Sequence, residues 1–433
     1  MSNVKYLPIK SKLFENNRKN FVKKLKKNSI AIFHSNDEMP RSADQVYDFK
    51  QDPDLFYLSG IDQEQTALIL FPEHPNKAYR EILFVRETSE HIKVWEGYKL
   101  TKDQAAKNSG IKTIKWAHEF DTILNMVVNA ADNIYLNLNE HDRSGSKQVP
   151  YKSLRFAKEM KEKFPLHEFD RAAPIMADLR AVKSKEEVEL MQKACDITEK
   201  GVRRILKFIK PGVMEYEIEA ELTHEFLSNR SAGHAYHPII ASGADACILH
   251  YGNNNKKCKD GDLILMDFGA EYANYRSDLT RTFPVNGKFT ARQKAVYNGV
   301  LRAFRTAEKN LVPGKTMADI NKAVSKVLEE ECIKLKLFTK ADLKKQKHPF
   351  QLLKKYFPHG NSHHIGLDVH DVGDRHMKIK PGMVFTNEPG LYLWDEGIGV
   401  RIENDFLVTK GKPIDLMANI PIEIKDIERL MKK

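Results

Sequence analysis

Two segments of this 433-residue chain repeat each other and place four acids at matching positions. The segments begin at the glycines in positions 261 and 382, and in each an apolar run leads to an acid six residues after the glycine, Asp267 in one and Glu388 in the other. Farther along, each segment supplies an arginine, one further residue and a second acid, Asp278 or Glu403. Asp267 therefore corresponds to Glu388, and Asp278 corresponds to Glu403.

Four ionised carboxylates gathered in a protein core would repel one another strongly, so positive charge must lie among them. Two divalent cations would bring the formal charge of the four acids back to zero. Hard ions such as Mn²⁺, Mg²⁺ or Co²⁺ accept ligation by oxygen atoms alone. The alternative is that the acids are exposed near strand ends, but that interpretation leaves their duplicated spacing unexplained. The acids therefore predict a metal site.

Histidines concentrate before the second acidic segment, at positions 359, 363, 364 and 370. His363 has no counterpart in the first segment, which makes it the natural fifth ligand and makes the two metal positions unequal. His250 lies 17 residues before Asp267, and His370 lies 18 before Glu388, so these two histidines correspond to each other. A lone histidine is more often a core or surface residue than a ligand. Clustering beside paired acids favours ligation for His363, and a role in supporting ligands or contacting substrate for His250 and His370.

The elements that must position these residues are duplicated as well. Pro-Gly pairs at 211–212 and 313–314 each end one helical pattern and open another. Ser184 and Glu187 form a capping box at the start of the first of these helices. The repeat is about 100 residues long, too long for a solenoid. It predicts two related halves of one domain that face each other across a pseudo-two-fold axis, with the site at that axis.

These residues resemble aminopeptidase P (Xaa-Pro aminopeptidase), of the pita-bread-fold metallopeptidases. The motifs are HGNSHHIGLDVHDVG from His359, MDFGAEYANYRSDLTRTFPV from Met266, TNEPGLY from Thr386 and GIGVRIE from Gly397. The resemblance implies an α+β fold, in which a pita-bread catalytic domain with an internal pseudo-two-fold axis spans 176–433. A smaller α/β amino-terminal domain at 1–170, with a role in oligomerisation or substrate access, is echoed by the segment 52–60. Prolidases, methionine aminopeptidases and creatinases share the fold, but creatinases lack this ligand set.

The resemblance also implies roles for individual residues. The five expected ligands of a dinuclear centre, usually loaded with manganese, are Asp267, Asp278, His363, Glu388 and Glu403. Glu388 is also the expected proton carrier between the attacking water and the leaving nitrogen. His370 is expected to donate a hydrogen bond to the developing oxyanion, and His250 to orient the substrate.

Four further residues are expected to bind substrate. Tyr392 matches a residue that lines the proline-ring pocket, and His359 is also expected to bind substrate. Arg401 is expected to be a partner of a metal ligand or a contact to the substrate carboxylate, with a structural salt bridge as the alternative. Trp95 is expected to approach the site of a neighbouring subunit, because related enzymes form dimers or tetramers. The alternative for Trp95 is a place in a hydrophobic core.

The resemblance therefore predicts a peptidase that releases an amino-terminal residue ahead of proline by means of a metal-activated water. A prolidase restricted to Xaa-Pro dipeptides is the alternative, although its motif usually reads Gly-Leu-Gly-His where this chain has His-Gly-Asn-Ser-His. A metal-free binding module on the same fold is disfavoured, since such relatives lose ligands. The partners expected are peptides with proline at the second position and further copies of the chain, as a homodimer or homotetramer.

Composition excludes several other classes. The formal charge of +11 could indicate a nucleic-acid partner, but the first 30 residues hold nine Lys or Arg against one acid, Glu15. That segment predicts a helix with a solvated basic face, so neither nucleic acid nor membrane is an expected partner. No apolar run reaches membrane-spanning length, and the start of the chain lacks a signal-peptide pattern, although a mitochondrial presequence is a minor alternative. The cysteines at 195, 247, 258 and 332 show no CxxC spacing, which favours reduced thiols and a cytoplasmic protein.

The first 170 residues predict strands at 30–33, 67–71, 82–85 and 134–138, without a cluster of acids or histidines. We expect the domain boundary between 164 and 174. The Lys-rich stretch 331–356 is expected to be an exposed insertion, with an ordered helical turn as the alternative.

Overall fold

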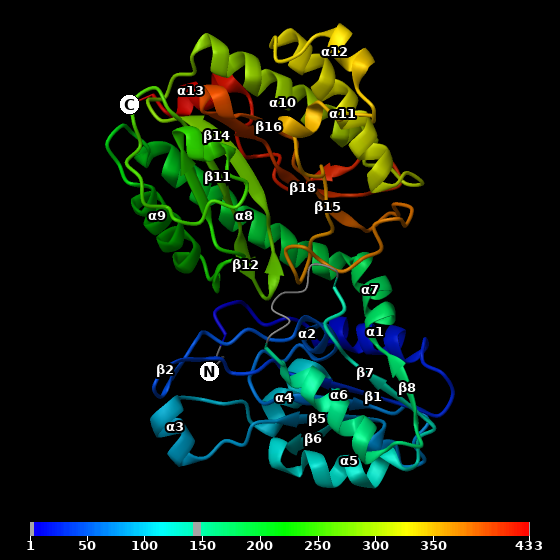
Figure 1. Cartoon of the computed structure of the whole chain (residues 1–433). Coiled ribbons are helices and arrows are strands. Elements are labelled where there is room, and N and C mark those ends of the chain that lie inside the picture. The colour runs from blue at the N-terminus through cyan, green and yellow to red at the C-terminus, as the bar shows by residue number, and fades with distance from the viewer. Residues whose placement is uncertain (1–3, 142–148, 433) are drawn as a thin grey trace. The chain divides into compact units, whose positions relative to one another are not determined.

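The computed structural model describes residues 4–141 and 149–432, and the chain divides into two compact units, 1–180 and 181–433 (Figure 1). Each unit has its own sheets and helices. The helix α7 (Ala173–Ala181) runs through the division.

The first unit is an α/β domain built on a six-stranded sheet of order β6-β5-β4-β1-β7-β8. Its strands are β1 (Ser29–His34), β4 (Ala67–Leu70), β5 (Glu81–Val85), β6 (Thr113–Trp116), β7 (Asn133–Leu136) and β8 (Glu168–Arg171), with a separate hairpin of β2 (Pro40–Ser42) and β3 (Gln45–Val46). Its other helices are α1 (Ser11–Val22), α2 (Pro53–Ser59), α3 (Glu90–Glu96), α4 (Lys102–Ser109), α5 (Phe120–Val128) and α6 (Lys152–Lys163). The predicted strands are confirmed.

Successive side chains of β1 point to opposite faces of the sheet, and helices pack against both faces. Ile30 and Ile32 point into a core that includes side chains of α5 and α6. Phe33 points to the opposite face, where its ring packs edge-on against Phe21 of α1 at 5.3 Å. All six residues of β1 are buried, and the four between its polar ends, Ser29 and His34, are apolar, as is typical of a strand covered on both faces.

The second unit contains two helical pairs and short antiparallel sheets. Its helices are α8 (Lys185–Phe208), α9 (Glu215–Ser228), α10 (Ala291–Asn310), α11 (Met317–Lys334), α12 (Lys340–Lys345) and α13 (Ile424–Leu430). The strands of its first half are β9 (Gly233–His234), β10 (Ile239–Ser242), β11 (Leu263–Phe268), β12 (Ala270–Tyr272), β13 (Tyr275–Arg276) and β14 (Leu279–Pro284). Those of its second half are β15 (Val384–Asn387), β16 (Gly390–Leu393), β17 (Ile398–Arg401), β18 (Asn404–Leu407) and β19 (Ile414–Asp415).

Each half has a helical pair followed by antiparallel strands, as the pseudo-two-fold prediction requires, although α12 occurs only in the second half and β9 and β10 only in the first. The helices α8 and α9 flank the first Pro-Gly turn, and α10 and α11 flank the second. The turn glycines have closely similar left-handed backbones, with φ of +98° at Gly212 and +89° at Gly314. The glycines that lead into the acidic strands also match, with +84° at Gly261 and +90° at Gly382. Such φ values favour glycine, so the glycines recur in the sequence where the same backbone conformation recurs in the two halves.

The Lys-rich stretch differs from the insertion that we expected. It begins inside α11, where the carboxylate of Glu331 is buried and pairs with Arg302 of α10, and it continues through α12. The ordered helical turn named as the alternative is present as α12, and the lysines of the stretch are exposed as expected. Most of these lysines lie on the exposed sides of α11, α12 and a 3₁₀ turn at Leu353–Lys355, while Lys336 and Lys347 lie in the connections between them.

Candidate metal centre

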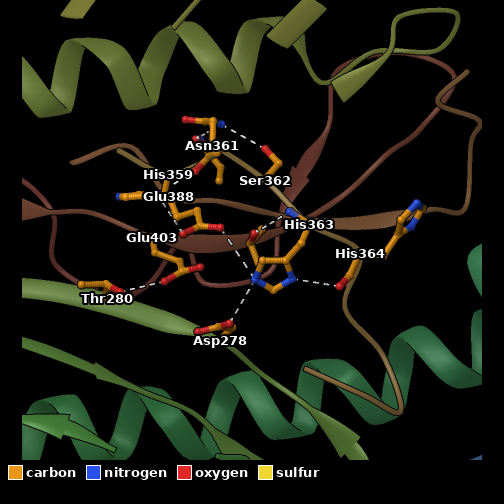
Figure 2. Close-up of polar contacts among 12 residues, drawn as sticks. Asp278, Thr280, His359, Asn361, Ser362, His363, His364, Glu388 and Glu403 are labelled. Atoms are coloured by element: carbon orange, nitrogen blue, oxygen red, sulfur yellow. Dashed lines mark hydrogen bonds and ion pairs between the residues drawn. The ribbon is translucent and has the colours of Figure 1, made fainter. Parts of the chain in front are cut away.

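Three of the expected ligands meet in the interior of the second unit. Asp278, His363 and Glu403 are buried, and each offers a ligand atom that lies within 4.8 Å of the others (Figure 2). Asp278 directly precedes β14 and Glu403 directly precedes β18, so each half of the fold delivers one acid from the start of a strand. His363 comes from the loop before β15. The site therefore lies where the two halves meet.

The backbone around His363 fixes the direction of its ring. Its N–H donates to Thr386 Oγ1 at 3.1 Å, and the Thr386 N–H donates to the His363 carbonyl at 3.0 Å. The ring Nδ1 lies 2.9 Å from the His364 carbonyl, while Nε2 faces Asp278 Oδ2 at 3.4 Å (Figure 2). An Nδ1–H that donates to a carbonyl leaves the Nε2 lone pair available, which is the usual arrangement of a metal-binding histidine.

Asp267 lies near the end of β11 and is held by two side chains. Its Oδ2 accepts from Arg401 Nη2 at 2.5 Å, and its Oδ1 accepts from the Tyr236 hydroxyl. The same hydroxyl is within hydrogen-bond distance of Asp278 Oδ1. Tyr236 thus spans the two acids of the first half.

Glu388 directly follows β15, and its N–H donates to the Asn361 carbonyl at 2.9 Å. Its two carboxylate oxygens face different imidazoles, with Oε1 at 3.8 Å from His363 Nε2 and Oε2 at 3.7 Å from His359 Nδ1. The carboxylate therefore belongs to the same cluster as the acids of the first half, although it approaches from the second.

Burial and mutual repulsion raise the pKa values of three of these four acids. Burial raises the pKa of Glu403 well above its usual range, and the charges of Asp278, Glu388 and Asp267 raise it further. Burial also raises the pKa of Asp267, and that of Glu388 to about 7. Asp278 is the exception, since burial would raise its pKa but the hydrogen bond to His363 lowers it below the ordinary value.

This donor set fits divalent cations. Four carboxylates and one imidazole converge in a buried space where the protein's own cations do not fully compensate the acids, as the raised pKa values show. Oxygen donors with one nitrogen suit hard to borderline divalent metals. Bound cations would supply the missing positive charge and allow all four acids to ionise.

The remaining histidines surround the cluster at different depths. The His370 ring stands perpendicular to that of His363, with 4.4 Å between ring centroids. His359 is part-buried near Glu388, and burial, followed by the charges of Arg401 and His250, lowers its pKa to about 3. His250 is exposed. His370 thus contacts a predicted ligand, while His250 acts on His359 electrostatically.

Tyr392 and Arg401 form a fixed pair beside Asp267. The Tyr392 hydroxyl accepts from Arg401 Nη1 at 2.7 Å and lies 2.8 Å from His359 Nε2. The tyrosine is 1% exposed. Gly390 leaves room for it, since a Cβ there would lie 2.7 Å from the Tyr392 hydroxyl. Because Arg401 is already engaged by Asp267 and Tyr392, the geometry favours its role as a partner of a metal ligand.

Trp95 lies in α3 of the first unit and is 76% exposed. The interpretation of Trp95 as a core residue is therefore wrong. An indole this exposed is available for contact with another surface.

Several residues of the site escaped sequence analysis. Thr280 donates to Glu403 Oε2 at 2.7 Å (Figure 2). The Asp278 N–H donates to Asp405 Oδ2 at 3.0 Å. A signal existed for these two, because each lies two residues beyond a predicted ligand, and alternate residues of a strand share a face. The sequence around Tyr236 carries no comparable signal.

Comparison with known proteins identifies the family to which the chain belongs. Residues 189–410 match metallopeptidase family M24, and residues 14–135 match the N-terminal domain of aminopeptidase P. The Xaa-Pro aminopeptidase of Haemophilus influenzae is 34% identical over 96% of both chains. The mouse Xaa-Pro dipeptidase is 28% identical over 97% of this chain and 93% of its own.

Solved structures give the same result. Aminopeptidase PepP of Pseudomonas aeruginosa matches with a TM-score of 0.90 at 30% identity, covering 98% of both chains. Escherichia coli aminopeptidase P with the inhibitor Pro-Leu matches with a TM-score of 0.88 at 30% identity, covering 98% of this chain and 99% of that one. Across residues 4–141 and 149–432, each helix is too short or too polar to cross a bilayer.

Proposed function

Because the chain belongs to metallopeptidase family M24 and, within it, to the aminopeptidase P family, we propose that it hydrolyses the bond between an amino-terminal residue and a following proline. That it is a metal-dependent peptidase follows from the family. The similarity to a curated Xaa-Pro aminopeptidase over nearly the whole of both chains carries the proline specificity. A prolidase restricted to dipeptides is the second candidate, favoured by the match to the mouse dipeptidase.

In this proposal two divalent cations, with Mn²⁺ as the native ion, bind the five residues Asp267, Asp278, His363, Glu388 and Glu403. Such cations polarise the scissile carbonyl and lower the pKa of a water toward neutrality. The chain's contribution is to hold the donors in place before metal arrives. Arg401 and Tyr236 hold Asp267, and Thr280 holds Glu403.

In this proposal Glu388 transfers the proton, and His370 stabilises the oxyanion. Glu388 takes a proton from the attacking water and returns it to the leaving nitrogen, as a carboxylate near the reacting atoms can do. His370, in ring contact with His363, donates to the carbonyl oxygen as negative charge develops there. His250 is exposed beside this region and orients the substrate.

Proline recognition is assigned to Tyr392 with His359, and Arg401 acts there only by fixing the Tyr392 hydroxyl. The phenol ring is anchored in an apolar cluster with Leu265 and Cys247, and its hydroxyl is fixed by Arg401 and His359. A rigid aromatic wall suits a pyrrolidine ring. Because the proline nitrogen of a peptide bond carries no hydrogen, a pocket for it needs no acceptor at that position.

We also propose a homodimer or homotetramer in the cytoplasm. The first unit exposes large apolar side chains at Met39, Tyr47, Val94, Trp95 and Tyr98, which is typical of a contact surface. In an oligomer, Trp95 would approach the site of a neighbouring subunit. All four cysteines are free and buried, in keeping with a reducing compartment. Neither nucleic acid nor membrane is part of the proposal.

A peptide series tests the proposed specificity. Kinetics on Ala-Pro, Ala-Pro-Ala and longer peptides separate the two candidates, because an aminopeptidase cleaves the longer peptides and a prolidase cleaves the dipeptide. Replacing proline by alanine at the second position should lower kcat/KM by about 10- to 200-fold, the usual discrimination from a partly empty pocket. Equal turnover of Ala-Pro-Ala and Ala-Ala-Ala would remove the proline specificity and leave the metallopeptidase assignment intact.

A further inference from the structure

Lys183 and Asp371 form an ion pair in the interior of the second unit. Lys183 Nζ lies 3.0 Å from Asp371 Oδ2, and both side chains are 1% exposed. Buried ion pairs contribute little net stability, because desolvation offsets their attraction and apolar side chains of similar size often serve as well. What such a pair does supply is one fixed geometry, so the chain segments that it joins indicate its use.

The pair joins the start of α8 to the loop that carries the histidines. Lys183 immediately precedes Ser184, the residue that caps α8, and its N–H donates to the Gly382 carbonyl at 2.8 Å. Asp371 immediately follows His370. Its N–H donates to the His364 carbonyl at 2.8 Å, which closes the loop on itself. The ion pair therefore anchors the end of this loop to the start of α8, across a separation of 188 positions between Lys183 and Asp371.

The loop is shaped around the pair. A Cβ on Gly366 would lie 2.3 Å from Asp371 Oδ2 and 2.9 Å from Lys183 Cε. The backbone of Gly366 does not require glycine, because its φ lies outside the left-handed region. Space for the ion pair is what excludes a side chain at this position.

His363 and His370 are both connected to the Lys183–Asp371 ion pair, but they depend on it to different degrees. The His364 carbonyl that accepts from Asp371 also lies 2.9 Å from His363 Nδ1. His363 has a second anchor of its own in its paired hydrogen bonds with Thr386 of β15. The backbone of His370 is bonded directly to that of Asp371, so the anchored end of the loop sets its position.

We propose that the Lys183–Asp371 ion pair is a positioning device for His370, which keeps that ring beside His363 and the carboxylate cluster. Charge on both partners holds the loop end in place, while Thr386 holds the predicted metal ligand independently. The inference rests on the proposed function, because it takes His370 as the donor to the developing oxyanion. It predicts that kcat depends on the ion pair and that metal content does not.

A double-mutant cycle tests this dependence. Lys183→Met keeps the length of the side chain and removes its charge, and it should lower kcat by about 10- to 100-fold, the loss typical of a misplaced catalytic group. KM and the number of metals bound per chain should stay as in the wild type. In a His370→Ala background the same substitution should change kcat by less than about twofold, because the group that it positions is gone. An equal loss in both backgrounds overturns the inference, and so does loss of metal from Lys183→Met.

Asp371→Asn provides a second variant should Lys183→Met fail to fold. Asparagine keeps the shape and one acceptor oxygen, so the same cycle applies with a smaller loss. The matched control is Glu331→Gln, which neutralises a carboxylate that is 3% exposed and pairs with Arg302 between α10 and α11. It should keep wild-type kcat, and a comparable loss there would assign the effect to general destabilisation and overturn the inference.

The cycle also separates this inference from the proposed function. It is run on whichever peptide the wild type cleaves fastest, so it does not require proline specificity. Wild-type kcat in His370→Ala would remove the proposed role of His370 and the inference with it. A strong loss in His370→Ala together with additive losses in the cycle would leave that role standing and remove the inference alone.

Discussion

Thr280 and Glu403 join the two halves of the second unit at the carboxylate cluster. Thr280 Oγ1 donates to Glu403 Oε2 at 2.7 Å, and the Glu403 N–H donates to the Thr280 carbonyl at 3.1 Å. One residue of β14 in the first half thus bonds both the backbone and the side chain of an acid in the second half. The position of Glu403 therefore depends on the contact between the halves.

Replacing Asp278 by alanine should abolish activity and release metal, because its carboxylate lies in the three-residue cluster at the centre of the site. The protein should remain folded, since the substitution removes one of several mutually repelling acids. Elemental analysis, circular dichroism and turnover measure these effects. The control is Asp395→Ala, which removes a carboxylate that is 86% exposed in the same unit. A folded Asp278→Ala protein with full metal content and normal turnover would show that Asp278 is not a ligand.

His370→Ala should retain metal and lose kcat. A donor that acts on the developing oxyanion typically accounts for about 10²–10³-fold in rate. Its ring contacts His363 without replacing any predicted ligand. Steady-state kinetics and metal analysis on the same preparation test both parts. Loss of metal from this variant would make His370 a ligand.

Tyr236→Phe should weaken metal binding by about 10- to 100-fold, the usual effect of removing a hydrogen-bond partner of a ligand. The hydroxyl contacts both Asp267 and Asp278, so its loss removes one hydrogen-bond partner from each of two acids of the first half. Competition with a chelator of known affinity measures the change. Tyr216→Phe, at an exposed tyrosine in α9, is the control and should bind metal like the wild type. Unchanged affinity in Tyr236→Phe would show that Arg401 alone suffices to hold Asp267.

The metal-free protein should lose stability as pH rises from about 7 to 9, above the range in which histidines whose pKa is lowered by burial, such as His359 and His364, contribute the opposite slope. Burial and neighbouring acids raise the folded-state pKa of Glu403, and burial raises that of Asp267, so the folded state binds more protons than the unfolded state in this range. His363 acts in the same direction, because Asp278 and Glu388 outweigh burial and raise its pKa to about 9. Asp278 contributes no slope there, since its pKa is lowered and it is ionised in both states.

Thermal unfolding across this pH range, with chelator and with added metal, measures the effect. Bound cations favour the ionised acids, so the loss should shrink or vanish in the loaded protein. A metal-free protein whose melting temperature is constant or increases between about pH 7 and 9 would contradict the assignment of raised pKa values to His363 and these acids.

Structural features that depend on residues close together in the chain could be predicted from the sequence. The strands of the first unit, the capped helix at Ser184 and the repeat of Pro-Gly turns all depend on residues within a few positions of one another. The four acids could be singled out because each acid position of the first segment recurs in the second, Asp267 as Glu388 and Asp278 as Glu403. The fold and the peptidase family are confirmed.

Contacts between distant segments could not be predicted in this way. Tyr236 reaches Asp267 and Asp278 from a short segment before β10, and nothing in its neighbours marks it. Lys183 and Asp371 are separated by 188 positions, and a single lysine or aspartate is ordinary surface composition until the fold buries it. The exposure of Trp95 likewise depends on tertiary packing rather than on the residues around it.

The matched glycines of the two halves have a consequence for how such a site can arise. Because Gly261 and Gly382 share one backbone geometry, each half supplies its acids by the same route. A shorter ancestor with a single half would carry two acids per copy, too few to hold a pair of cations. It could assemble the full set of four only by pairing with an identical copy about a true two-fold axis. Gene duplication and fusion would then make that assembly permanent, and free one half to acquire His363.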